Sequence, residues 1–562
     1  MIEAELVRLI RTAVEATAAE LALDGPAPEI EILRPRQKEH GDYATGVALA
    51  LAAGAGGRNP RAIAEALLRH LPPADFVDRA EVAGPGFINF FVTHGWLHGV
   101  VEQVRRLGGD YGRVDVGAGE RVLVEFVSAN PTGPLHVGTG RNAAVGDALA
   151  RVLAFAGYEV SREYYVNDAG SQMELFGASV EARYLEHFGR PAEVPERGYH
   201  GAYVRELAAA IAQDLGDEPL DMPAPERRRK LAEEGMARAL EGIRGTLERF
   251  GVRFDTWFRE STLHETGRVQ QALELLRERD LAYEAEGALW FRAERFGDDK
   301  DRVLVRASGD PTYFAADTAY LRDKFARGFD HLIYVWGADH HGTVKRLEGA
   351  ATAFGYEVDR VEFILTQLVS LYRDAEPVRM SKRTGDIVTL DELVEEVGPD
   401  AARYTLLTRS VDSALDFDIE HVKRRSLDNP VYYVQYAHAR IASVIRFARE
   451  QGVELGEEEA PADLLTHETE LDLMRKIAEL PSLIRLVADG RAPHRLTRYA
   501  EEVAAGFHRF YTACRVVTED ADLTRARLHL AAATRQVIAN VLGLLGVSAP
   551  ESMERLGEED EA

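Results

Sequence analysis

Hydrophobic residues recur at helical spacing at the start of the chain. One largely apolar face of this segment comprises Leu6, Leu9, Ile10, Ala13, Val14, Thr17 and Leu21. Steps of three and four residues place these side chains on one side of a helix. Further along, the run 87–92 is an apolar strand that follows turn residues at 84–86. Residues 1–115 therefore combine helices with short strands, and glycines near 108–109 and 117–119 indicate a linker.

Short apolar runs alternate with helical patterns from about residue 116 to residue 415. The strand candidates are 122–127, 160–166, 303–307, 331–336 and 360–369. This alternation predicts a parallel, doubly wound sheet that binds ligands at the carboxyl ends of its strands. The stretch from about 173 to 250 is helical and rich in charge, which indicates an insertion between two halves of the sheet.

Strand signals end near Phe417. Beyond it, apolar positions recur at helical spacing, as in Val431, Val434, His438, Ile441, Val444, Ile445 and Ala448. A helical bundle is the simplest interpretation of this C-terminal part. The pattern thus predicts three units, at 1–115, 116–415 and 416–562.

Composition narrows the class of protein. The chain of 562 residues is long enough for several domains with substantial cores. Its single cysteine, Cys514, excludes an internal disulfide and a cysteine-cluster zinc site, which suits a reducing compartment. The N-terminus has no basic stretch followed by an apolar one, and no apolar stretch is long enough to span a bilayer. We therefore expect a cytoplasmic protein without a membrane partner.

The formal net charge of −26 argues, taken alone, against a nucleic-acid partner. Phosphate contacts need only local positive potential, however, and an acidic remainder suppresses non-specific binding. Basic residues cluster at 34–38 and at 423–425. Each cluster is a candidate contact, although a solvated surface is the more usual role of such residues.

The clearest chemical signal is the segment 128–141, Ser-Ala-Asn-Pro-Thr-Gly-Pro-Leu-His-Val-Gly-Thr-Gly-Arg. It follows a β-rich run and precedes an alanine-rich helical pattern at 142–155. A strand, a tight turn and a helix N-terminus together attract phosphate, and Gly138 lets phosphate approach closely beside His136. One such turn is a weak signal, because most are ordinary connections.

A second phosphate-directed segment, Arg-Met-Ser-Lys-Arg-Thr-Gly, lies far downstream at 379–385. The two segments resemble the His-x-Gly-His and Lys-Met-Ser-Lys-Ser motifs of class I aminoacyl-tRNA synthetases. Residues 124–126, 165–168 and 429–441 narrow the resemblance to arginyl-tRNA synthetases. The resemblance covers essentially the whole chain.

The resemblance implies a fold for each unit. It implies an α/β architecture, with a Rossmann-like class I catalytic domain at 116–415 that carries the helical insertion. The first unit, where 39–45 and 84–92 match the family, becomes an α+β domain that contacts the outer corner of the tRNA. The last unit becomes an all-α anticodon-binding bundle.

The resemblance also implies an activity, which is ATP-dependent ligation of L-arginine to tRNA(Arg) through an arginyl-adenylate, for protein synthesis. The partners are then tRNA(Arg), L-arginine and ATP with Mg2+; no zinc or organic cofactor is expected, and the enzyme is expected to be a monomer. Candidate ATP-binding residues are His136, Gly138, Thr139, Met380, Ser381 and Lys382, and His136, Thr139 and Lys382 are also the catalytic candidates. Candidate arginine-binding residues are Ser128, Asn130, Glu260, Tyr313, Asp317 and His340.

Arginine recognition has clear physical demands. A guanidinium group is always charged, planar and forked, so a selective pocket needs carboxylates held in a fixed frame. Tyr313 and Asp317, one helical turn apart, and Glu260 match the residues that form this frame in the family. His340 lies where the family often has glutamine. Its cluster with Asp339 and His341 suggests a metal site by composition, but adjacent histidines do not easily converge on one ion.

Two positions depart from the family motifs. Thr139 replaces the second histidine of the first motif, and Arg379 replaces the first lysine of the second. A hydroxyl is a weaker donor to phosphate than an imidazolium, whereas arginine preserves the charge. Two alternatives stay open at this point: another nucleotidyltransferase with a His-x-Gly-His motif, and a catalytically silent RNA-binding relative.

Overall fold

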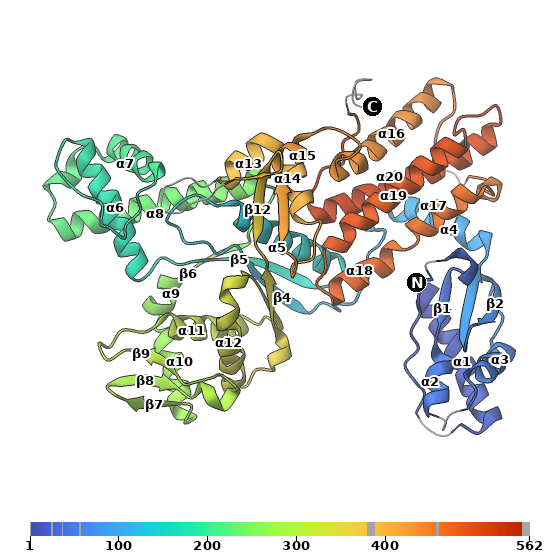
Figure 1. Ribbon diagram of the computed structural model, residues 1–562, viewed down its shortest axis with the longest axis horizontal. Coiled ribbons are helices and arrows are strands. Elements are labelled where there is room, and N and C mark those ends of the chain that lie inside the picture. Colours follow the sequence, from blue (N-terminus) through green and yellow to red (C-terminus); the bar gives the residue numbers. More distant parts are fainter. Residues whose placement is uncertain are drawn as a thin grey trace.

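The computed structural model describes residues 2–23, 26–35, 37–54, 58–378, 388–456 and 460–553. The molecule is elongated (Figure 1). The N-terminal elements form one end, α6–α8 form the other, and the parallel sheet lies between them, with the C-terminal helices running from the sheet toward the N-terminal end.

The N-terminal unit packs three helices on a small antiparallel sheet of order β1-β3-β2. Its elements are α1 (Ile2–Leu21), β1 (Tyr43–Thr45), α2 (Val47–Gly54), α3 (Pro60–His70), β2 (Val77–Ala83) and β3 (Phe87–Val92). The predicted face of the first helix is buried, except that Leu9 and Leu21 at its margin are only half-buried. The predicted strand at 87–92 is confirmed as β3.

The next helix, α4 (His94–Leu107), packs against C-terminal helices of the bundle, α17 and α20. The segment after it is also fixed there. The Tyr111 hydroxyl donates to the Ile477 carbonyl at 3.1 Å, and the Asn540 amide donates to the Gly108 carbonyl at 2.9 Å. The glycines at 108–109, where the sequence indicates a linker, therefore lie in a packed contact.

The central sheet has five parallel strands in the order β11-β10-β4-β5-β6. They are β4 (Arg121–Phe126), β5 (Glu159–Val166), β6 (Thr256–Arg259), β10 (His331–Gly337) and β11 (Val361–Thr366). Four of these strands coincide with predicted runs. The strand β6 was not predicted, because it has only four residues and follows a polar segment.

Two strand predictions need correction. The run 303–307 does not join the parallel sheet: β9 (Arg302–Val305) belongs to a separate antiparallel sheet with β7 (Ala282–Ala285) and β8 (Ala288–Phe291). The run 360–369 breaks after β11, and Val369 begins β12 (Val369–Arg373). That strand pairs with β13 (Glu376–Pro377) and β14 (Leu415–Asp418) in a third small sheet. An apolar run indicates a strand, but not the strand that it pairs with.

Helices surround the central sheet. The insertion between β5 and β6 consists of α6 (Ser171–His187), α7 (Ala202–Leu215) and α8 (Ala224–Arg249), and its core includes Phe176, Tyr184 and Ile211. The other helices of this unit are α5 (Val137–Phe155), α9 (Glu260–Glu265), α10 (Arg268–Glu278), α11 (Tyr313–Ala326) and α12 (His341–Ala353). Short 3-10 turns occur at Lys38–His40, Gly108–Asp110, Glu218–Asp221, Ala293–Phe296, Ala338–His340, Val358–Arg360 and Ala462–Leu464.

The C-terminal part is all-helical after β14, as predicted. Its helices are α15 (Ile419–Lys423), α16 (Pro430–Glu450), α17 (Glu468–Ile477), α18 (Leu480–Asp489), α19 (His494–Ala513) and α20 (Ala521–Leu545); α13 (Leu390–Val397) and α14 (Pro399–Leu406) precede them. The predicted face of α16 is buried, with Ile445 half-buried.

The expectation that no apolar stretch is long enough to span a bilayer is wrong. Among the described helices, α20 is long and apolar enough to cross a bilayer. However, 67% of its apolar window is buried inside the fold, where it packs against α16, α19 and α4. These contacts are those of a core helix.

A buried arginine joins the catalytic and C-terminal parts. The guanidinium of Arg403 in α14 donates to the Asp147 carboxylate of α5 at 2.6 Å. It also donates to the carbonyls of Phe250, after α8, and Leu545, at the end of α20, both at 3.1 Å. Arg403 is only 1% exposed, so these acceptors replace water around its charge.

Candidate active site

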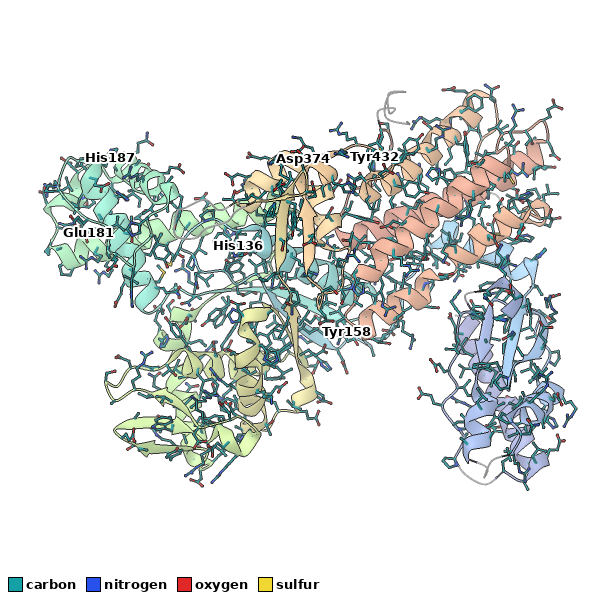
Figure 2. All side chains as sticks on the ribbon, viewed as in Figure 1. His136, Tyr158, Glu181, His187, Asp374 and Tyr432 are labelled. Atoms are coloured by element: carbon teal, nitrogen blue, oxygen red, sulfur yellow. The ribbon has the colours of Figure 1, made fainter. Side chains whose placement is uncertain are left out.

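The first motif forms the turn between β4 and α5. His136 is the N-cap of α5, and its Nδ1 accepts the backbone N–H of Thr139 at 3.3 Å. The helix thus begins several residues before the predicted alanine-rich segment. A Cβ on Gly138 would lie 3.1 Å from the His136 ring, so the glycine leaves room for this exposed side chain. In Figure 2, His136 lies near the middle of the molecule, between α6–α8 and the C-terminal helices.

The flank of the second motif is bonded to this turn. Thr389 and His136 form an antiparallel β-bridge, and the Leu390 N–H donates to the Leu135 carbonyl at 2.8 Å. A Cβ on Gly140 would lie 2.7 Å from Leu390, so the glycine permits this close approach. Met380, Ser381 and Lys382, with Arg379, lie outside the described residues. Thr389 and Leu390, a few residues after the second motif in the sequence, thus lie against the first motif.

The chain is strained where β4 ends. Val127 and Ser128 have φ values of +68° and +40°, a left-handed region that costs energy for residues with a Cβ. Hydrogen bonds hold this conformation. The Ser128 hydroxyl donates to Glu125 Oε1 and accepts the Tyr165 N–H, both at 3.1 Å. The Asn142 side chain accepts the Val127 N–H at 2.6 Å. Ser128 is therefore held at the carboxyl ends of β4 and β5, and Asn130 is exposed beyond it.

A cavity of about 370 Å³ opens beside these strand ends. It is lined by Ala169, Gly170, Glu260, Ser261, His264, Glu265, Arg306, Pro311, Thr312 and Tyr313. Glu260 begins α9 and is 4% exposed, whereas Tyr313 begins α11 and is 47% exposed. The cavity thus has an acidic group at depth and an aromatic ring at its surface.

Hydrogen bonds from β5 fix Glu260. The Asn167 amide, oriented to face acceptors, donates to Glu260 Oε2 at 3.0 Å, and the Tyr165 hydroxyl also donates to this carboxylate. Asp168 accepts the backbone N–H and the hydroxyl of Ser261, each at 2.8 Å. Burial raises the pKa of Glu260 above its usual value, and the Tyr165 hydroxyl and His264 oppose that effect.

Asp317 lies one helical turn after Tyr313 and is half-buried. Burial raises its pKa to about 7, and the negative charges of Glu260 and Glu125 add to the effect. Glu260 and Asp317 therefore lie close enough to interact, and both carboxylates lack sufficient positive charge around them. A cationic ligand would supply that charge.

His340 is less closely joined to this cavity. Its ring lies 5.5 Å from the Trp336 ring, its Nε2 lies 4.0 Å from Asp339, and its side chain is more than half exposed. Across the described part of the chain, no group of three or more histidine, cysteine or acidic residues is placed to hold a metal ion.

Sequence reasoning missed three residues of the site: Glu125, Tyr165 and Lys324. Glu125 is a charged residue inside the apolar run of β4, and that signal was visible in the sequence. Its ion pair with Lys324, which is 1% exposed, joins residues far apart in the chain and has no local signal. Tyr165 was noted as part of a family segment, without its link to Glu260.

The fold and the two motifs define the class of protein. A parallel sheet with a His-Val-Gly-Thr turn after β4, bonded to the flank of a Met-Ser-Lys segment, is the architecture of a class I aminoacyl-tRNA synthetase. The model of the "tRNA synthetases class I (R), catalytic domain" matches residues 103–206 and 227–422. The "Arginyl tRNA synthetase N terminal domain" model matches residues 5–92, and the "DALR anticodon binding domain" model matches residues 434–553.

Close relatives specify the family. The arginine–tRNA ligase of Carboxydothermus hydrogenoformans is 52% identical over 93% of this chain and 94% of its own. The arginine–tRNA ligase of Desulforudis audaxviator is 50% identical over 98% of this chain and 99% of its own. The solved arginyl-tRNA synthetase of Thermus thermophilus has 25% identity and a TM-score of 0.77, covering 98% of this chain and all of that one. The chain belongs to the arginyl-tRNA synthetase family.

The family assignment settles the activity. The protein is an enzyme that uses ATP to join arginine to tRNA. This confirms the resemblance inferred from the motifs, and nothing in the comparisons supports the silent relative or another nucleotidyltransferase.

Proposed function

We propose that the arginine substrate binds in the cavity between α9 and α11, with its guanidinium facing Glu260, Asp317 and Tyr313. The observation that carries this proposal is the pairing of two carboxylates: Glu260 lines the cavity, and Asp317 lies close enough for the negative charge of Glu260 to raise its pKa. A guanidinium is a fixed cation with forked donors, so it matches a pair of carboxylates better than the compact ammonium of lysine does. Ser128 and Asn130 lie toward the amino-acid end of the substrate, and His340 takes the more peripheral position at the end of β10.

ATP binds, in this proposal, at the turn that contains His136, Gly138 and Thr139. The first turn of α5 offers the positive end of a helix dipole, and His136 offers a side-chain donor. In this proposal Met380, Ser381 and Lys382 also contribute to ATP binding; it is supported by the bridge between Thr389, further along the same segment, and His136. ATP brings Mg2+ with it as part of the substrate, and the protein holds no resident zinc or organic cofactor.

These residues serve two acyl-transfer steps. The arginine carboxylate attacks the α-phosphate of ATP, pyrophosphate leaves, and arginyl-adenylate forms. A hydroxyl of the terminal adenosine of tRNA(Arg) then attacks the acyl carbon, and AMP leaves. Alignment and charge neutralisation supply most of the rate of such a phosphoryl transfer. His136 and Lys382 provide the stronger donors, and Thr139 provides a neutral one.

The remaining parts of the proposal concern the whole enzyme. Residues 1–115 contact the corner of the tRNA, the unit at 116–415 catalyses both steps, and the helices of 416–562 bind the anticodon. The enzyme acts as a monomer in the cytoplasm, without a membrane partner.

Pyrophosphate exchange with ATP tests the arginine pocket. Asp317→Asn removes one carboxylate at nearly constant shape, and it should raise the KM for arginine at least about tenfold, as expected for a broken buried charge pair. The KM for ATP should stay within about twofold, because Asp317 does not face the phosphates. The assay is run with and without tRNA, since the family resemblance implies that activation needs tRNA. Equal effects on both substrates would rule out the assigned pocket.

A further inference from the structure

One face of α11 carries a series of polar residues that are buried or half-buried. Asp317, Tyr320 and Lys324 follow one another at steps of three and four residues, and Arg327 caps the helix along the same line. Such spacing places them on one side of the helix. That side lies against β4 and β5, because Lys324 pairs with Glu125 and Arg327 donates to Glu163 at 2.6 Å.

The sheet explains why two cations are needed there. Glu125 of β4 and Glu163 of β5 are directly opposite each other in the parallel register, and both are buried. Like charges at such positions repel, so each requires a partner of opposite charge. Lys324 supplies one partner and Arg327 the other. The ammonium of Lys324 also lies 4.1 Å and 3.8 Å from the ring centres of Tyr320 and Tyr334.

The two pairs differ in what they touch. The carboxylate of Glu163 accepts from Arg327 and from the Tyr320 hydroxyl, which is 2.5 Å away. The carboxylate of Glu125 uses Oε2 for Lys324 and Oε1 for the Ser128 hydroxyl. Ser128 is the left-handed residue at the end of β4, and its hydroxyl also fixes the Tyr165 N–H. Among the described residues, the Lys324 pair is joined by hydrogen bonds to Ser128, whereas the Glu163 pair approaches the proposed arginine site through the ring contact of Tyr320 with Tyr165.

We infer that Lys324 is a positioning residue for arginine activation: it holds Glu125 so that the second carboxylate oxygen of Glu125 fixes Ser128 at the amino-acid end of the substrate. Lys324 itself is fully enclosed and does not contact substrate. This inference rests on the proposed function, because it takes Ser128 to be part of the arginine site.

A matched pair of variants tests the inference in the full-length enzyme. Lys324→Met and Arg327→Met each remove one cation from the same helix face. Lys324→Met should raise the KM for arginine at least about tenfold while the KM for ATP changes less than about twofold. Arg327→Met should lower the melting temperature but leave the KM for arginine within about twofold. Equal effects of the two variants on arginine would show a general charge balance and overturn the inference.

A second measurement separates positioning from a general loss of structure. If Lys324 acts through Ser128, Lys324→Met should add less than about twofold to the KM for arginine in a Ser128→Ala background. If the increases in the KM for arginine caused by Lys324→Met and Ser128→Ala multiply fully in the double variant, the inference is overturned. If Lys324→Met does not fold, Lys324→Gln carries the same test, because its amide lacks the positive charge and the reach of lysine and holds Glu125 less firmly. A normal KM for arginine in the lysine variants, beside a raised KM in Asp317→Asn, would refute this inference alone; a normal KM in Asp317→Asn would refute the proposed pocket.

Discussion

The Nε2 atom of His136 lies 3.3 Å from the hydroxyl of Thr139, the residue that replaces the second histidine of the family motif. Position 139 thus adjoins the main phosphate-binding candidate. We expect Thr139→His to change the rate of arginine activation by about tenfold at most, equivalent to ~1.4 kcal/mol. Pyrophosphate exchange measures this rate.

His136→Ala provides the comparison for that experiment. Loss of a donor that acts in the transition state should cost about a hundredfold or more in kcat. An inactive wild-type enzyme that Thr139→His restores would contradict the assignment of Thr139 as a tolerated residue.

Asp317 should make arginine binding depend on pH. Its pKa is raised from 3.8 to about 7, chiefly by burial, so below neutral pH the empty site holds a proton. A guanidinium favours the ionised carboxylate, and the affinity for arginine should therefore rise as pH increases from about 6 to 8. Calorimetry in buffers of different ionisation enthalpy should detect proton release on binding. Asp317→Asn should bind weakly at every pH, and an unchanged pH dependence in this variant would exclude Asp317 as its source.

The same group affects stability in the opposite direction. A carboxyl whose pKa is raised in the folded state stabilises the fold below its unfolded pKa, and this contribution is lost as pH rises through about 7. The arginine-free enzyme should therefore lose stability between about pH 4 and 7 through this group. Asp317→Asn should flatten that decline in a series of thermal melts, whereas parallel curves for the two proteins would contradict the prediction.

We expect the folded protein to depend on the buried ion pair between Arg403 and Asp147 for its stability. Arg403→Met removes the fully buried cation of the pair and leaves Arg151, at 2.7 Å, as the nearest cation to Asp147, so the variant should cost at most about 3–5 kcal/mol of stability. The double variant Arg403→Met with Asp147→Asn should lose less, because both charges are then absent. Denaturant unfolding, followed by probes in the catalytic and C-terminal parts, measures the free energy of unfolding of the single and the double variant. A double variant that is no more stable than Arg403→Met would refute this account.

The N-terminal unit should contribute to tRNA binding despite the acidic total charge. It is attached to α17 by Lys38, which pairs with Glu468 at 2.7 Å and Asp472 at 2.6 Å, and by Asp42, which pairs with Arg475 at 2.6 Å. Deleting residues 1–92 spares α4, which packs in the bundle. This deletion should weaken tRNA binding and reduce its salt dependence, by about one unit of slope or less per lost phosphate contact.

The control for the deletion is the binding of ATP and arginine, measured without tRNA. Both affinities should be unchanged, because these pockets lie on the central sheet. Equal tRNA affinity of the full-length and shortened proteins would show that the N-terminal unit makes no RNA contact.

Local sequence patterns predicted much of this fold. Apolar runs located four strands of the central sheet, and steps of three and four residues located the faces of α1 and α16. The same patterns could not assign β9 to its antiparallel sheet, because pairing depends on residues elsewhere in the chain. The four-residue strand β6 was too short to show any periodicity.

The candidate site was predicted to a similar extent. The motif residues around His136 were recognised because they are contiguous, and Glu260 and Asp317 were recognised from family segments. The partner of Glu125 was not, since Lys324 lies 199 residues away and an isolated lysine in a helix is an ordinary surface feature. The contact between Thr389 and His136 is likewise a product of the folded chain.

The hydrogen bond between Arg403 and Leu545 can form only late in the synthesis of this protein. Its acceptor at Leu545 is translated 142 residues later, so the nascent catalytic domain emerges from the ribosome before this bond can form. A messenger cut short before codon 545 yields a chain whose buried guanidinium has one nitrogen without its acceptor. Such a chain should therefore unfold more readily, and cellular proteases should degrade it faster than the full-length enzyme.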